Sequence, residues 1–127
     1  MKYYTSYIAV SKKIPSDILQ VSIMRFCPNY YTPDMELKGL APKQDDLLAY
    51  KYGKISELEF IRRYNEKVLS RVDGDKLDTY FNSLSNKPNG VAFICVEKPD
   101  AFCHRHLLAR HLKKWNLDIE EFTPLHN

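Results

Sequence analysis

The sequence predicts an α/β fold, a single compact domain with a small, mostly parallel sheet of about four to five strands flanked by helices. Residues 91–96 (VAFICV) are apolar without alternation, as is typical of a strand covered on both faces. Segments with helical periodicity are interleaved with segments of strand composition. At 127 residues the chain is long enough for one packed core and short for two. We therefore expect one domain over 1–127.

Two strands are expected near the amino terminus, at residues 3–10 and 19–26, because both segments are rich in β-branched and aromatic residues. Only eight residues separate them, which is short for a parallel crossover. The link is either a hairpin or a cramped turn around Pro15, and the pairing stays open. Residues 27–42 contain three prolines and one glycine. This composition predicts a long ordered loop, and loops of this length are usually functional.

Helices are expected in the middle of the chain. Residues 43–53 form a short helix that ends at Gly53 in the left-handed conformation. Ser56 and Glu59 form a Ser-x-x-Glu capping box that begins the next helix. The buried stripe of that helix is expected to be Leu58, Ile61, Tyr64, Val68 and Val72. A further helix is expected over 75–85.

The region after the central strand predicts another helix and an edge strand. Asp100 is expected to cap the helix, and alternation over 117–122 predicts the edge strand. The apolar face of the helix is expected to consist of Ala101, Leu108, Leu112 and Trp115. Ligands of such folds bind beyond the carboxyl ends of the strands. Residues 25–28 and 95–105 occupy that position.

Composition excludes several classes of protein. The formal net charge of +3 is mild, without the clustered basic stripe of a dedicated DNA-binding domain. No run approaches the roughly 20 apolar residues of a membrane span, and the amino terminus lacks the apolar stretch of a secretory signal. We expect a cytoplasmic protein with no membrane partner, whose three cysteines are reduced thiols.

The triplet Cys103, His104 and Arg105 opens the helix after the central strand. At about 100° per residue, both His104 and Arg105 point toward the sheet. A charged side chain on such a face is expected to pair with a carboxylate or to meet a ligand. By contrast, Arg110, Lys113 and Lys114 are expected to form a solvated face.

Cys103 would lie in the first helical turn, where unpaired N–H groups and two basic neighbours favour a reactive thiolate. The alternative is a packed, inert cysteine. On a helical wheel its side chain points away from Arg105. Glu97 and Lys98, just past the central strand, are further candidates. The Glu97 carboxylate could accept two hydrogen bonds from the guanidinium of Arg105 or of Arg25. If that pair is permanent, its role is structural.

Three established templates do not fit. The Cys-x5-Arg spacing of cysteine phosphatases is absent, because the residue that follows five intervening positions is Ala109 when counted from Cys103 and Ala101 when counted from Cys95. A zinc site built on Cys27, Cys95 and Cys103 lacks any paired ligand spacing. The four glycines form no phosphate-binding loop. We therefore expect no metal and no cofactor.

With these residues identified, the chain resembles domain of unknown function 488 (DUF488), a family of bacteria and phages, over nearly its whole length. CVEKPDAFCHRHLLARHL (95–112) is similar to the family's Cys-x-Glu-Lys-x4-Cys-His-Arg motif and the Leu-Leu-Ala after it. Weaker similarities are YTSYIAVSKKIP, VSIMRFCP, LAP and EFIRRYNEKVL.

The resemblance implies a compact α/β domain with its motifs at one end of the sheet, but no activity. The candidate site residues that it implies are Arg25, Pro28, Tyr64, Glu97, Cys103, His104 and Arg105. Cys27 departs from the family, which more often has a basic or small residue there.

Our first hypothesis is an enzyme, or a degenerate enzyme, that binds an anionic small molecule or nucleotide at the carboxyl ends of the strands. Arg25 and Arg105 would bind the anion and, with Glu97, would converge on one pocket. Tyr64 and Lys98 are further ligand contacts. Glu97 and His104 would transfer protons, and Cys103 would be a nucleophile or a redox thiol.

The alternative hypothesis is a binding module without chemistry. It would recognise a nucleotide or single-stranded nucleic acid through the tyrosines of PNYYTP (28–33) and the charge of Lys113 and Lys114. A third possibility is an interaction protein in which the Cys-His-Arg motif only joins helix to strand.

Overall fold

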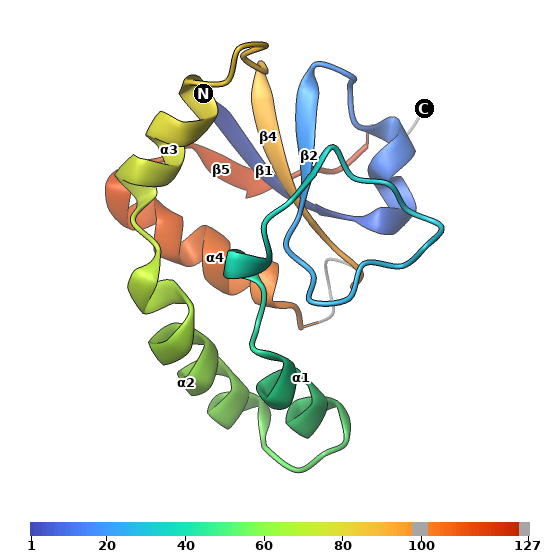
Figure 1. Ribbon diagram of the computed structural model, residues 1–127, viewed down its shortest axis with the longest axis vertical. Helices are drawn as coiled ribbons and strands as arrows, with labels where there is room; N and C mark the ends of the chain where they lie inside the picture. Colours follow the sequence, from blue (N-terminus) through green and yellow to red (C-terminus); the bar gives the residue numbers. More distant parts are fainter. Residues whose placement is uncertain (98–101, 125–127) are drawn as a thin grey trace.

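The computed structural model describes residues 1–97 and 102–124 and contains a five-stranded parallel sheet in the order β3-β2-β4-β1-β5 (Figure 1). The strands are β1 (Lys2–Tyr7), β2 (Ile18–Ser22), β3 (Met35–Glu36), β4 (Gly90–Cys95) and β5 (Ile119–Glu121). Every residue of β4 is buried. The predicted α/β class and the central position of the apolar strand are confirmed.

The first two strands do not pair with each other. Both are parallel to β4 and lie on opposite sides of it. The first ends at Tyr7, earlier than predicted, and the link contains a 3-10 helix, Ile8–Lys13. The hairpin alternative is therefore wrong.

The Pro-rich loop contains regular structure that its composition did not indicate. Within residues 27–42, β3 pairs with β2 and is followed by a 3-10 helix, Lys38–Leu40. The Asp34 carboxylate accepts a hydrogen bond from the Gln20 N–H at 2.8 Å and thereby ties the loop to β2. A two-residue strand leaves too little periodicity to be recognised.

The helices are α1 (Gln44–Lys51), α2 (Glu57–Lys67), α3 (Gly74–Asn82) and α4 (His104–Leu112), with 3-10 turns at Leu69–Arg71 and Lys113–Trp115. In Figure 1, α4 lies beside the sheet, α2 lies on the far side of α4, and α1 packs beside α2. None of the helices in the described part of the chain is long and apolar enough to cross a membrane.

Two predicted helix boundaries are confirmed. Gly53 has a positive φ of 70° after the end of α1, and the Ser56 hydroxyl accepts a hydrogen bond from the Glu59 N–H at 3.1 Å. The predicted stripe of α2 is partly wrong, since Leu58 is 79% exposed and Phe60 is buried instead. The Phe60 ring contacts Tyr50 and Phe102, so its burial depends on other elements.

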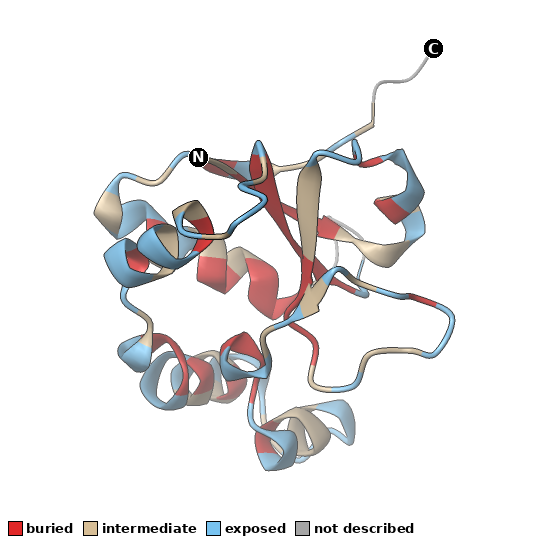
Figure 2. Ribbon diagram, turned by 45° about the horizontal axis from the view of Figure 1, so that its top comes forward, coloured by how far each residue is buried: buried red, intermediate tan, exposed pale blue. Residues whose placement is uncertain are grey.

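The aromatic core lies between the sheet and the helices. Figure 2 shows the buried residues concentrated in the central strands and in α4. Tyr3 of β1 stacks on Phe93 of β4, and Phe81 of α3 contacts both rings. This packing holds α3 against the central strands of the sheet.

The last helix begins later than predicted. Its N-cap is Cys103, with extended φ and ψ of −151° and 144°. Asp100, the predicted cap, lies outside the described residues, as do Lys98 and Ala101. Leu108 and Leu112 are buried as predicted. The predicted solvated face is confirmed, because Arg110, Lys113 and Lys114 are all exposed.

Candidate functional site

A cavity of about 330 Å³ opens where β2 and β4 end. Its lining includes the polar or charged residues Arg25, Lys51, Glu97 and His104, together with Cys95 and Cys103. Its apolar walls include Phe26, Tyr50, Phe60 and Phe102. The volume is at the lower end of the range for ligand pockets. The cavity therefore has the position predicted from the fold class.

Arg25 is anchored against the segment that follows β3. Its Nε donates to the carbonyl of Pro42 at 2.9 Å, and its Nη2 donates to the carbonyl of Lys38 at 3.2 Å. In return, Lys38 Nζ donates to the carbonyl of Arg25 at 3.0 Å. A guanidinium has five N–H donors, so these bonds orient the group without using its full capacity.

Cys95 and Cys103 form a disulfide with an S–S distance of 2.00 Å. The prediction of reduced thiols is therefore wrong for these residues, whereas Cys27 is a free cysteine. The strand ends at Cys95, and the chain returns at Cys103 to begin α4, which brings the sulfurs together. Cys103 is extended, so the helical wheel misplaced its side chain.

His104 is buried beside this disulfide with a defined orientation. Its Nε2 lies 2.7 Å from the carbonyl oxygen of Ile23, and because a carbonyl only accepts, Nε2 carries the proton. Its Nδ1 therefore presents a lone pair, 3.8 Å from Cys103 Sγ. Burial lowers the pKa of His104 to about 4. The imidazole is therefore neutral at neutral pH.

Arg105 is completely buried and does not belong to the cavity lining. Its Nε and Nη2 donate to the two carboxylate oxygens of Glu121 at 3.2 and 3.0 Å. Its Nη1 donates to the carbonyl of Glu97 at 2.6 Å and lies 3.7 Å from Cys95 Sγ. The predicted pairing with a carboxylate is confirmed, but the partner is Glu121. Arg25 and Arg105 therefore do not share this cavity.

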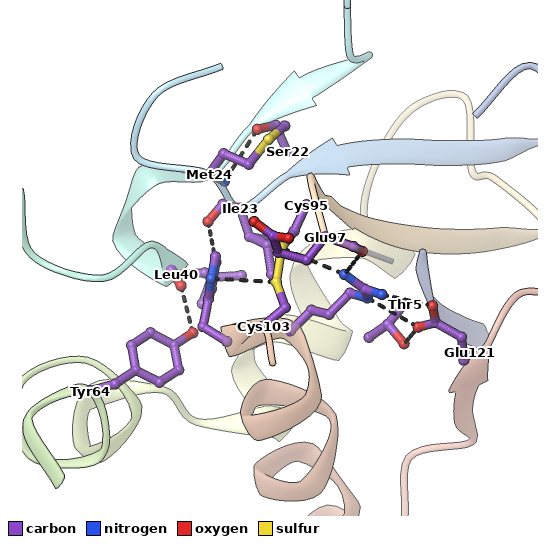
Figure 3. Close-up of a disulfide and its surroundings, with 12 residues drawn as sticks. Thr5, Ser22, Ile23, Met24, Leu40, Tyr64, Cys95, Glu97, Cys103 and Glu121 are labelled. Atoms are coloured by element: carbon purple, nitrogen blue, oxygen red, sulfur yellow. Dashed lines mark hydrogen bonds and ion pairs between the residues drawn. A yellow bond between two sulfur atoms is a disulfide. The ribbon is translucent and has the colours of Figure 1, made fainter. Parts of the chain in front are cut away.

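Tyr64 is a buried supporting residue. Its hydroxyl donates to the carbonyl of Leu40 at 2.6 Å, and its ring meets His104 edge-on with centroids 5.5 Å apart. Burial raises the pKa of Tyr64, so it stays a neutral phenol. Figure 3 shows Tyr64 and Leu40 on one side of the disulfide, with Thr5 and Glu121 on the other.

Of the predicted site residues, the structure brings Arg25, Glu97, Cys103 and His104 to one cavity. Arg105 and Tyr64 are close behind it, and Pro28 is half-buried in the loop after β2. Sequence reasoning missed Lys51 and the aromatic walls. Tyr50 and Lys51 lie on α1, which carries no motif that points to this edge of the sheet. Phe60 lies on α2 within the weaker similarity EFIRRYNEKVL, but it was not named as a site residue.

The tyrosines and lysines of the alternative hypothesis do not form one surface. Tyr30 is 78% exposed, but Tyr31 is buried and donates to Gln20 Oε1 at 2.8 Å. Lys113 and Lys114 extend α4 toward β5, at the opposite edge of the sheet from the 28–33 loop (Figure 1).

Comparison with known proteins gives a family match. A family model described as the active DUF488-N3 subclade matches residues 5–116, most of the chain. Neither the curated proteins nor the solved structures compared with the chain include a significant match. The matched segment extends from within β1 to the turn after α4 and includes every residue that lines the cavity. The chain therefore belongs to the DUF488 family.

Proposed function

We propose that this chain is a small enzyme that binds an anionic small molecule in the cavity at the ends of β2 and β4 and acts on it through the Cys95–Cys103 pair. One observation carries the proposal, namely that an anchored guanidinium, two sulfurs and aromatic walls line the same cavity. The description of the matching family model as an active subclade is consistent with it.

The residues that line the cavity offer two kinds of contact. Arg25 and Lys51 supply positive charge for an acidic group, and Phe26, Tyr50, Phe60 and Phe102 supply apolar surface for a flat or aliphatic body. Pockets that bind small molecules specifically commonly combine apolar walls with a few polar groups. The substrate class that we favour is a small anionic thiol, because its acidic group would meet Arg25 and its sulfur would meet the disulfide. A nucleotide without a thiol could occupy the cavity but could not react.

Thiol–disulfide exchange is the reaction that the sulfur pair favours. A substrate thiolate would attack Cys103 Sγ, and Cys95 would leave as a thiolate beside Arg105 Nη1, which lies 3.7 Å from its sulfur. A second substrate thiolate would attack the mixed disulfide and release Cys103. Two substrate thiols would thus become one disulfide, and the two cysteines would gain two electrons and two protons.

The same steps run in reverse when the pair is reduced. We also propose a cytoplasmic location, where thiols are kept reduced and structural disulfides are rare. In that compartment the reduced pair would reduce a substrate disulfide.

The proposal is tested by comparing the rates at which two small thiols of similar basicity reduce the Cys95–Cys103 bond. Mercaptoethanesulfonate is anionic and 2-mercaptoethanol is neutral. Arg25 should make the anionic thiol the faster reagent, and Arg25→Ala should remove about tenfold or more of that preference, since a hydrogen bond to a charged group contributes about 1.5–3 kcal/mol.

Arg62→Ala is the matched control, because Arg62 is an exposed arginine that pairs with Glu59 and Glu66 on α2. Calorimetric titration of AMP and adenosine into the oxidised protein tests separately whether a nucleotide binds in the cavity without reacting. The proposal fails if both thiols react alike with the parent protein, or if Arg62→Ala and Arg25→Ala have the same effect.

A further inference from the structure

The sulfurs of Cys95 and Cys103 and a ring nitrogen of His104 form a compact cluster of metal-ligating atoms. The three atoms lie within 4.8 Å of one another, and all three residues are buried. Thiolate sulfur and imidazole nitrogen are the ligands that Zn²⁺ prefers. We infer that reduction of the Cys95–Cys103 bond creates a zinc-type site whose three protein ligands are Cys95 Sγ, Cys103 Sγ and His104 Nδ1.

The orientation of His104 supports this assignment independently of the sulfurs. Metal-bound histidines usually donate their second ring N–H to a carbonyl or carboxylate, which fixes the tautomer. His104 has this arrangement, with Nε2 bonded to the carbonyl of Ile23 at 2.7 Å and Nδ1 facing Cys103 Sγ. The edge-on ring of Tyr64 packs against the imidazole and restricts its rotation.

The distances also suit a tetrahedral ion. Zn–S bonds of about 2.3 Å and Zn–N bonds of about 2.0 Å place the nitrogen and sulfur ligands about 3.6 Å apart and the two sulfurs about 3.8 Å apart. Nδ1 and Cys103 Sγ are already 3.8 Å apart. The two bonded sulfurs must separate, and their Cα atoms are 7.5 Å apart, which accommodates two separate thiolates.

The fourth coordination position would face the cavity, since all three ligands belong to its lining. A site with three protein ligands and one open position is typical of catalytic zinc. Arg105 Nη1, 3.7 Å from Cys95 Sγ, would donate to that thiolate from outside the coordination sphere. The ion would thus be accessible to a ligand in the cavity, whatever the identity of that ligand.

The metal can bind only after the disulfide is reduced. A phosphine reductant breaks the S–S bond and supplies two electrons, becoming a phosphine oxide, and water supplies its oxygen and the two thiol protons. Zn²⁺ then displaces one proton from each thiol as it binds. Because the oxidised pair has no thiolate to offer, the site exists in only one redox state of the protein.

Cobalt(II) titration of the reduced, desalted protein under argon tests the inference. We expect one Co²⁺ per chain, with sulfur-to-cobalt charge-transfer bands in the near ultraviolet and tetrahedral d–d bands in the visible, all lost on adding Zn²⁺. The unreduced protein should show none of these bands. His104→Gln keeps both thiols and should bind at least about tenfold more weakly, with shifted d–d bands.

Cys27→Ser is the matched control and should behave like the parent protein, because Cys27 is the cysteine outside the pair. Zinc K-edge absorption of the loaded wild-type protein should show two sulfur ligands and one imidazole, which needs no variant. Absence of cobalt bands after reduction, or a zinc site without imidazole, would overturn the inference. Failure of the proposed enzyme function appears separately, as loss of the Arg25-dependent preference in the oxidised protein.

Discussion

Arg105 and Glu121 form a buried, two-bond ion pair that joins the start of α4 to the edge strand β5. The Arg105 side chain is fully buried and that of Glu121 is 19% exposed. The Thr5 hydroxyl donates to the same carboxylate, and Arg105 also lies over the Tyr7 ring, 5.6 Å from its centroid. This pair holds the helix start in place next to the sulfurs.

Arg105→Ala should destabilise the protein by about 3–5 kcal/mol, because it leaves the Glu121 carboxylate without its buried partner. Urea denaturation followed by circular dichroism measures the free energy of unfolding. Arg110→Ala, on the exposed side of the same helix, should unfold at the same urea concentration as the parent. An Arg105→Ala protein with unchanged stability would contradict the role of the pair.

The corrected register of α2 makes a second prediction. Phe60→Ala should cost about 3–5 kcal/mol in the free energy of unfolding, because it removes a buried ring between α1, α2 and the start of α4. Leu58→Ala should change that free energy by no more than about 0.5 kcal/mol, because Leu58 is exposed. Equal effects of the two substitutions, measured by urea denaturation, would support the register predicted from the sequence instead.

The thiol count distinguishes the bonded from the reduced state. Unfolded without reductant, the purified protein should react with one equivalent of a thiol reagent, at Cys27, and after reduction with three. Mass spectrometry of the alkylated peptides would identify the sites, and Cys27→Ser should leave no reactive thiol before reduction. The disulfide closes a loop between residues eight positions apart. Closing such a loop contributes about 2–3 kcal/mol, so reduction should lower the free energy of unfolding by that amount. Three reactive thiols without reductant would contradict the disulfide.

The stability of the folded chain should fall as acid protonates His104. Its folded pKa of about 4 lies below the unfolded value of about 6.5, so the unfolded chain takes up the proton first as the pH decreases. The free energy of unfolding should therefore decrease from about pH 6.5 to about pH 4, by roughly 3 kcal/mol in total. Urea denaturation at several pH values measures this slope. His104→Gln should lack this component, and an identical slope in both proteins would refute the assignment.

Local patterns were sufficient for much of the fold. The apolar run of β4, the cap at Ser56 and the left-handed Gly53 each depend on residues close together in the chain, and each is confirmed. Patterns failed where burial depends on distant partners. Leu58 and Phe60 both suit a helix, and only the rings of Tyr50 and Phe102 determine which of them is buried.

The sequence by itself identified the end of the sheet at which the site lies and four of the residues that line its cavity, because the order of strands and helices and the Cys-His-Arg triplet are readable from the chain. Only the tertiary structure decided which residues Arg105 and Cys103 bond to. Glu121 pairs with Arg105 because β5 lies next to β1 in the sheet. Cys95 bonds to Cys103 because the end of β4 lies close to the start of α4. Such pairings join elements whose spacing in the sequence has no fixed relation to their distance in space, so they follow only from the packed fold.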